Sequence, residues 1–77
     1  MENWRRFIGV DGTYEWESEN FNIIRSGGTD RSGHFTYNLG AYGLEDIHRE
    51  FWGWFDTLRE AKDAAETIVR YNPEKYS

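Results

Sequence analysis

The sequence has no cysteine, a single proline and only two histidines. Without cysteine the chain can form neither a disulfide nor a thiolate metal site, and this composition is typical of proteins of a reducing cytoplasm. No run of apolar residues approaches the ~18 that a membrane span needs. Residues 1–6 lead into no apolar stretch of the kind that a secretory signal requires. We therefore expect a cytoplasmic protein that does not enter a membrane.

Basic residues are also scarce, with nine lysines and arginines against fourteen acidic residues and a net charge of −5. The acidic residues are spread over both halves of the chain and are not gathered in a tail. A chain of this sign is repelled by nucleic-acid phosphates unless its few bases gather on one face. We therefore expect a protein partner in preference to direct binding of nucleic acid.

Motifs of catalysis are lacking as well. The sequence contains no nucleophile elbow, HExxH pair or phosphate-binding loop, and His34 and His48 lie far apart. We interpret His34 as a solvated strand residue and His48 as a surface residue. A metal site built from His48, Glu45, Asp46 and Glu50 is an alternative that ranks well below this interpretation. The sequence predicts a protein that is not an enzyme and that has no metal or cofactor.

Aromatic residues, in contrast, are abundant: four Trp, five Tyr and five Phe make up 18% of the chain. A chain of 77 residues is enough for one domain, residues 1–77, but a domain of this size buries only about 60–65% of its unfolded surface. Each aromatic side chain can bury roughly 150–250 Å². We expect aromatic packing to replace the disulfides or metals that stabilise other small domains.

Extended segments alternate with turn residues over the first two thirds of the chain. Asp11 and Gly12 predict a hairpin between the first two segments. Residues 26–33 are rich in glycine and serine and predict a surface loop, and residues 40–46 are ambiguous because their two glycines favour a turn. Residues 21–25 either continue the strand before them or form a new one. The segments rich in aromatic and β-branched residues that predict strands are residues 4–10, 13–19, 21–25, 34–39 and 50–55.

The last segment of the sequence predicts a single helix. Asp56 or Thr57 is suited to the N-cap position, and Glu60 would complete a capping box with Thr57. Pro73 ends the helix near Tyr71. The sequence therefore predicts an α+β fold, an antiparallel sheet of three to five strands followed by one C-terminal helix packed on one face. Apolar residues follow the N-cap at helical spacing: Leu58, Ala61, Ala65 and Ile68.

Residues 13–19 alternate cleanly, with Glu15, Glu17 and Glu19 on one face of the expected strand. Carboxylates on alternate strand residues stand about 6.5–7 Å apart. Such a strand can bind a basic groove on another protein, including a nucleic-acid-binding one. The alternative is a solvated face that discourages aggregation through the strand edge. Glu45 and Asp46 would extend this acidic surface if their loop lies nearby.

Residues 50–55 are aromatic on both faces of the expected strand, with the odd-numbered residues facing one way and Trp52 and Trp54 the other. One face should meet the helix, and the other should be partly exposed. Exposed aromatic residues often anchor an interface. We therefore add Trp16 and Trp52 to the expected partner-binding residues. The partner could also be a second copy of the chain, in a homodimer that buries the uncovered sheet face.

Residues 51–61 resemble the last strand and helix start of the three-stranded-sheet-plus-helix DNA-binding domains of the AP2 and integrase N-terminal types. The recurring pattern of these domains is Gly-x-Phe-x-Thr-x-x-x-Ala, which Gly53, Phe55, Thr57 and Ala61 match. The segment is also similar to one in small uncharacterised phage proteins. A structural explanation needs no DNA, because the glycine would let the helix approach, the phenylalanine would pack under it, the threonine would cap it and the alanine would seat it.

The resemblance to DNA-binding domains implies a sheet face that enters the major groove with arginine, lysine and tryptophan. Here the alternating strand presents Glu15, Glu17 and Glu19 instead, and these repel phosphate. The resemblance to phage proteins implies an accessory protein of a phage or other mobile element in the host cytoplasm. We expect a non-enzymatic protein that binds and inhibits a host protein by occlusion, as anti-CRISPR proteins do. The alternative is an AP2- or integrase-like DNA-binding module that uses the arginines.

Overall fold

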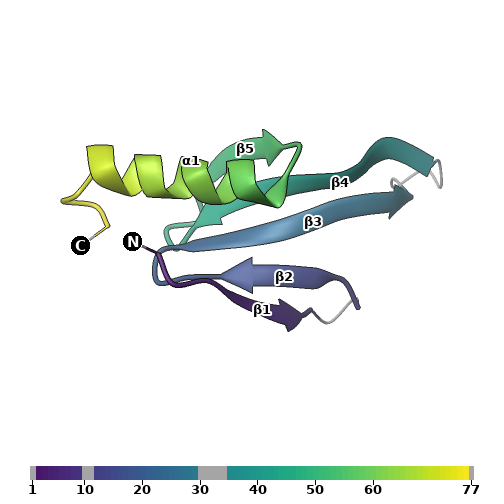
Figure 1. The fold of residues 1–77 in the computed structure, drawn as a ribbon, viewed down its shortest axis with the longest axis horizontal. Coiled ribbons are helices and arrows are strands. Elements are labelled where there is room, and N and C mark those ends of the chain that lie inside the picture. Colours follow the sequence, from purple (N-terminus) through teal and green to yellow (C-terminus); the bar gives the residue numbers. More distant parts are fainter. Residues whose placement is uncertain (1, 10–11, 30–34, 77) are drawn as a thin grey trace.

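A computed structural model describes residues 2–9, 12–29 and 35–76 of the chain. The described residues form five strands and one helix: β1 (Arg5–Ile8), β2 (Tyr14–Glu17), β3 (Phe21–Thr29), β4 (Phe35–Asp46), β5 (Phe51–Phe55) and α1 (Leu58–Tyr71). Neighbouring strands pair antiparallel in the order β1-β2-β3-β4-β5, and α1 lies on one face of the sheet against β3, β4 and β5 (Figure 1). This confirms the predicted α+β fold with one C-terminal helix.

Strands β3 and β4 are longer than the sequence predicts and extend beyond the other strands at one end (Figure 1). β3 continues into the glycine-rich segment as far as Thr29, and β4 includes all of residues 40–46. The prediction of a loop over residues 26–29 was therefore wrong. The rest of that predicted loop, together with His34, lies outside the described residues, as does Asp11 of the predicted hairpin turn. Its neighbour Gly12 has a φ of +85°, and β1 and β2 pair on either side of this turn.

A β-bulge interrupts the pairing of β4 with β5. Leu44 pairs with Gly53 and the next residue, Glu45, pairs with Phe51, so Trp52 is an extra residue in β5. Gly53 has a φ of +120°, a conformation that residues with a β-carbon rarely adopt. A β-carbon at Gly53 would meet nothing within 4 Å. The backbone conformation, and not close approach of the helix, therefore explains this glycine, and the packing reason given for it from the sequence was wrong.

The bulge changes which aromatic residues of β5 share a face. Trp52 and Phe55 pack against the buried core, whereas Phe51 and Trp54 have ring centroids only 5.3 Å apart and are exposed. The strict alternation predicted for residues 50–55 was therefore wrong. One extra residue in a strand shifts the two-residue alternation, so every side chain that follows it points to the opposite face from the one expected.

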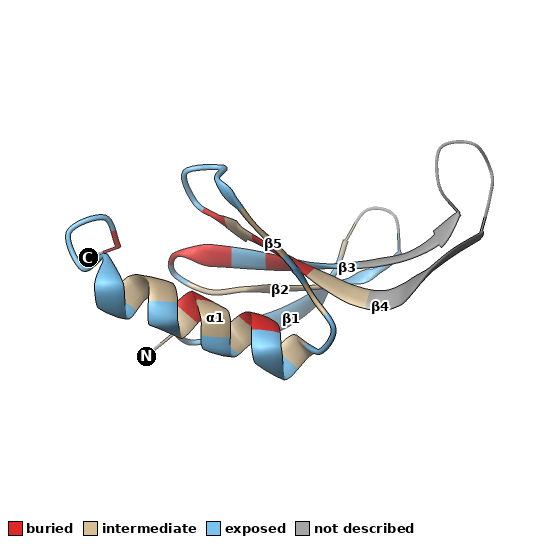
Figure 2. Ribbon diagram, turned by 90° about the horizontal axis from the view of Figure 1, so that it is seen from above, coloured by how far each residue is buried: buried red, intermediate tan, exposed pale blue. Residues whose placement is uncertain are grey.

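The helix begins at one of the two N-cap positions that the sequence offers, Asp56 and Thr57. Thr57 is the N-cap, and its hydroxyl accepts a hydrogen bond from the Glu60 N–H at 3.1 Å. Ala61 and Ala65 are fully buried, so the helix backbone lies close to the sheet (Figure 2). The core consists of residues from β3, β4, α1 and the chain after the helix: Phe21, Ile23, Leu44, Ala61, Ala65 and Tyr76.

Candidate binding surface

The face of the sheet opposite α1 carries two rows of side chains that cross all five strands. Residues paired across antiparallel strands point to the same side of a sheet. The intervening row contains Trp16, Ile23 and Leu44, which pack in or against the core together with Ala61 and Ala65 of α1. The two rows that flank this one therefore lie on the other side. We call these ten residues the open face: Phe7, Glu15, Ile24, Gly43 and Trp54 in one row, and Arg5, Glu17, Asn22, Glu45 and Phe51 in the other.

The apolar side chains of the open face are accessible to solvent. Phe7 is 38% exposed, Ile24 37%, Phe51 46% and Trp54 53%. Figure 2 shows α1 on one side of the sheet. Because Ile23 and Leu44 pack in the core with residues of that helix, the side chains of the open face point away from α1, which does not cover them. Exposed apolar residues gathered on one face of a small domain are typical of an interaction surface. The open face is therefore the strongest candidate for a functional site.

The charged side chains of the open face are mainly acidic. Arg5 forms an ion pair with Glu17. Glu15 and Glu45 are half-buried and form no ion pair with a described residue. Each of them stands beside an apolar residue in the register, Glu15 between Phe7 and Ile24, and Glu45 next to Phe51. The open face thus combines apolar contact area with unneutralised negative charge.

The structure places three of the predicted acidic residues, Glu15, Glu17 and Glu45, together on the open face. Glu19 lies beyond the last residue of β2. Its carboxylate accepts hydrogen bonds from the backbone N–H of Asn3 at 3.1 Å and from the side-chain amide of Asn3 at 3.0 Å. The backbone hydrogen bond from Asn3 is the largest cause of a lowered pKa at Glu19. Glu19 therefore holds the N-terminal segment at the edge of this surface.

The two tryptophans predicted to bind a partner lie on the helix side of the sheet, away from the acidic residues. Trp16 pairs in register with Ile23 of the core, and its ring meets Tyr42 edge-on with centroids 5.6 Å apart. Trp52 donates a hydrogen bond from its indole N–H to Asp46 at 3.2 Å. Both side chains are half-buried against the core. The structure therefore does not bring Trp16 or Trp52 together with the acidic residues of the open face.

Asp46 is buried, with an exposed fraction of 3%, so it does not extend the acidic surface as the sequence suggested. One carboxylate oxygen accepts from the Tyr76 hydroxyl at 2.5 Å and the Trp52 indole, and the other accepts from the backbone N–H groups of His48 and Glu50 at 2.9 Å each. Burial raises the pKa of Asp46, but these hydrogen bonds outweigh it, so the pKa is lowered. Asp46 thus joins the β4–β5 turn to the C-terminal tail.

Sequence reasoning missed the apolar part of the open face, namely Phe7, Ile24, Phe51 and Trp54. The one available signal was Gly43, a glycine within a strand. A β-carbon at Gly43 would lie 2.8 Å from Cζ3 of Trp54, so the indole of Trp54 lies directly over this residue. The missing β-carbon of Gly43 leaves room for the Trp54 ring, so the ring lies on the face to which a side chain at position 43 would point.

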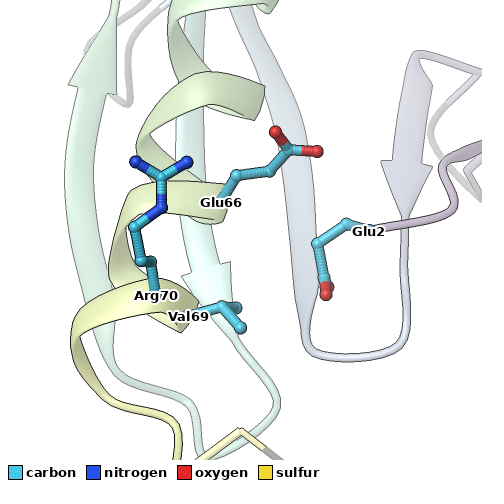
Figure 3. A pocket seen from close by; sticks show the side chains of 4 residues that line it. All are labelled: Glu2, Glu66, Val69 and Arg70. Carbon is cyan, nitrogen blue, oxygen red and sulfur yellow. The ribbon is translucent and has the colours of Figure 1, made fainter.

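A pocket of about 260 Å³ lies between the N-terminal segment and α1 (Figure 3). The carboxylate of Glu2 accepts hydrogen bonds from the Ser18 hydroxyl at 2.7 Å and from the Asn20 side chain at 3.2 Å. Glu2 therefore secures the N-terminal segment to the turn between β2 and β3, and its oxygens are already engaged. The pocket is lined by Glu2, Glu66, Val69 and Arg70.

Within residues 2–9, 12–29 and 35–76, no three acidic or histidine side chains are grouped so that they could hold a metal ion. The alternative metal site that the sequence offers does not form such a group; it consists of His48, Glu45, Asp46 and Glu50. The helix described here is neither long nor apolar enough to cross a membrane. No protein-family model matches the chain, and no characterised protein or solved structure is significantly similar to it.

Proposed function

We propose that this chain is a non-enzymatic protein that binds another protein through the open face of its sheet. The observation that supports this function is the set of four exposed apolar side chains on the face that α1 leaves uncovered. Two of them, Phe51 and Trp54, form an aromatic pair. Aromatic residues at the centre of an interface commonly contribute much of the binding energy. A sheet presents such residues on a preorganised surface, which lowers the entropic cost of association.

The specific form that we propose is stoichiometric inhibition by occlusion, in which a phage or mobile-element protein covers a surface of a host protein in the host cytoplasm. Anti-CRISPR proteins are the example that the phage-like segment suggests. Inhibition by occlusion requires a surface that binds the host protein, and it requires no catalytic residues. The net charge of −5 favours a partner whose contact surface is basic, and complementary charge increases the rate of association.

Reading of DNA by the sheet, as in AP2-type domains, finds less support in the open face. Its three carboxylates would be directed at phosphate, and its arginine, Arg5, is paired with Glu17. Arg6 and Arg25 pair in register with Trp16 and Tyr42, so they point to the helix side. DNA binding is therefore an outcome that the test must be able to reveal.

The test compares proteins captured from a lysate of the host cell by the immobilised wild-type chain and by two variants. Trp54→Ala removes an aromatic residue of the open face, and the control Tyr71→Ala removes one on α1 that is 75% exposed. Circular dichroism and thermal unfolding establish that each variant is folded.

We expect one protein to be retained by the wild type and by Tyr71→Ala and to be lost with Trp54→Ala. Equal capture by Trp54→Ala and the wild type would contradict the proposal. Salt-sensitive retention of DNA in place of a protein would contradict it as well, and would favour the DNA-binding module.

A further inference from the structure

Glu45, Phe51 and Trp54 form a distinct group within the open face. Glu45 and Phe51 are cross-strand partners, a position in which β-carbons are about 4.5–5.5 Å apart. The ring of Phe51 packs against that of Trp54 at 5.3 Å with an interplanar angle of 60°. Gly43 lies under the Trp54 ring, so β4 supports this ring from below. The group therefore presents a carboxylate next to a phenylalanine ring that in turn packs against an exposed indole.

Other aromatic residues of this chain already have a cation near the ring. The guanidinium of Arg6 lies 4.7 Å from the centroid of Tyr14. Lysine ammonium groups lie 5.9 Å from the rings of Trp4 and Trp52. Among the described residues, no cation lies over Phe51 or Trp54, although Trp54 is 53% exposed.

Glu45 follows Gly43 by two residues on the same face of β4, about 6.5–7 Å along the strand from the glycine that the Trp54 ring covers. A carboxylate at this spacing from an exposed indole favours an arginine side chain. The guanidinium is planar, so it can stack on the indole and at the same time donate two hydrogen bonds to a carboxylate. The negative face of the indole also attracts the positive charge of the guanidinium. Glu45 forms no ion pair with a described residue, so its carboxylate can accept these hydrogen bonds.

We infer that Glu45, Phe51 and Trp54 form a binding site for an arginine side chain of the partner protein. This inference rests on the proposed function, because it names the chemistry of the surface that the open face would cover. A second copy of this chain is a poor occupant. Face-to-face association would bring the carboxylates of two open faces together, and the base of this face, Arg5, is already paired with Glu17.

The test uses the full chain labelled with ¹⁵N and three blocked tripeptides: tri-arginine, tri-lysine and tri-citrulline. Citrulline has nearly the shape of arginine without its charge. The readout is the set of four indole N–H signals, with that of Trp54 assigned from the variant Trp54→Phe. We expect tri-arginine to shift the Trp54 signal in a saturable way, tri-lysine to act more weakly and tri-citrulline to have no effect. The signals of Trp16 and Trp52 should not move, because both side chains lie on the helix side.

Two variants that remove one negative charge each serve as a matched pair. Glu45→Gln should weaken the binding of tri-arginine about fivefold, corresponding to the loss of one charge-assisted contact. Glu15→Gln lies on the same face but beside Phe7 and Ile24, away from the aromatic pair, and should weaken binding less than twofold. Equal effects of the two variants, or shifts of the Trp16 and Trp52 signals as large as that of Trp54, would indicate non-specific attraction to an acidic protein and would overturn the inference.

The capture experiment separates this inference from the proposed function. If Trp54→Ala abolishes capture of the partner while Glu45→Gln leaves capture unchanged, the open face binds a protein but the arginine site is wrong. If neither substitution changes capture, the proposed function is wrong as well. Loss of capture with both, together with the selective shift of Trp54, would support both.

Discussion

The hydroxyl of Tyr76 fixes the C-terminal tail to the core, and the substitution Tyr76→Phe removes that hydroxyl alone. Tyr76 is 4% exposed, and its ring stacks on Phe21 with centroids 5.2 Å apart. Its hydroxyl donates to the buried carboxylate of Asp46 at 2.5 Å. A phenylalanine at this position keeps the ring and its stacking, so any loss of stability reports on the hydrogen bond.

The expected loss is about 2 kcal/mol, because a hydrogen bond to a charged group contributes about 1.5–3 kcal/mol. A domain of this size has a free energy of unfolding of roughly 4–12 kcal/mol, so the loss is a substantial part of the total. The melting temperature should fall by about 8–16 °C.

Urea denaturation at pH 7, followed by tryptophan fluorescence, measures this difference. Tyr71→Phe is the matched control, because Tyr71 is 75% exposed and its substitution should change stability by less than about 0.5 kcal/mol. If Tyr76→Phe were as stable as the wild type within that margin, the conclusion that Asp46 holds the tail would be refuted.

Three further predictions concern the backbone of the sheet and the titration of its buried carboxylate. Gly43→Ala should cost about 1 kcal/mol and shift the indole N–H signal of Trp54, because the added β-carbon would lie 2.8 Å from an exposed ring that can move outward. Gly53→Ala should cost about 1–3 kcal/mol in urea denaturation, because its φ of +120° is strained for a residue with a β-carbon; an unchanged stability would refute the assigned bulge conformation. Stability should fall on acidification, because the folded-state pKa of Asp46 is lowered: its contribution is complete above the unfolded value of about 3.9 and is lost as the pH falls through the folded value. The free energy of unfolding, measured by urea denaturation at several pH values across this range, should decrease more with falling pH for the wild type than for Asp46→Asn.

The helix could be predicted from the sequence because its signals are local. The Thr57 cap acts on an N–H three residues away, and Ala61 and Ala65 fall on one face by helical spacing. The contribution of Tyr76 could not be predicted in the same way. Its partner, Asp46, lies 30 residues away, and no pattern after Pro73 indicates that the chain returns to the core.

The candidate surface was predicted in part. Strict alternation in β2 places Glu15 and Glu17 on one face, as the sequence indicates. In β5 the same reasoning selected Trp52, whereas the bulge places Trp54 on the open face. The sequence interpretation attributes Gly53 to helix packing, whereas this glycine permits the bulge. A bulge depends on the register with β4, which the sequence of β5 alone does not determine.

The central claim, that the open face binds another protein, is tested most directly by photo-crosslinking in the host cell. The photoreactive residue p-benzoyl-phenylalanine is placed at Phe51 on the open face or, as a control, at Tyr71 on α1. We expect irradiation to join the chain to a different protein from position 51 and not from position 71. Adducts of equal yield from both positions, an adduct from position 71 alone, or an adduct between two copies of this chain would contradict the claim.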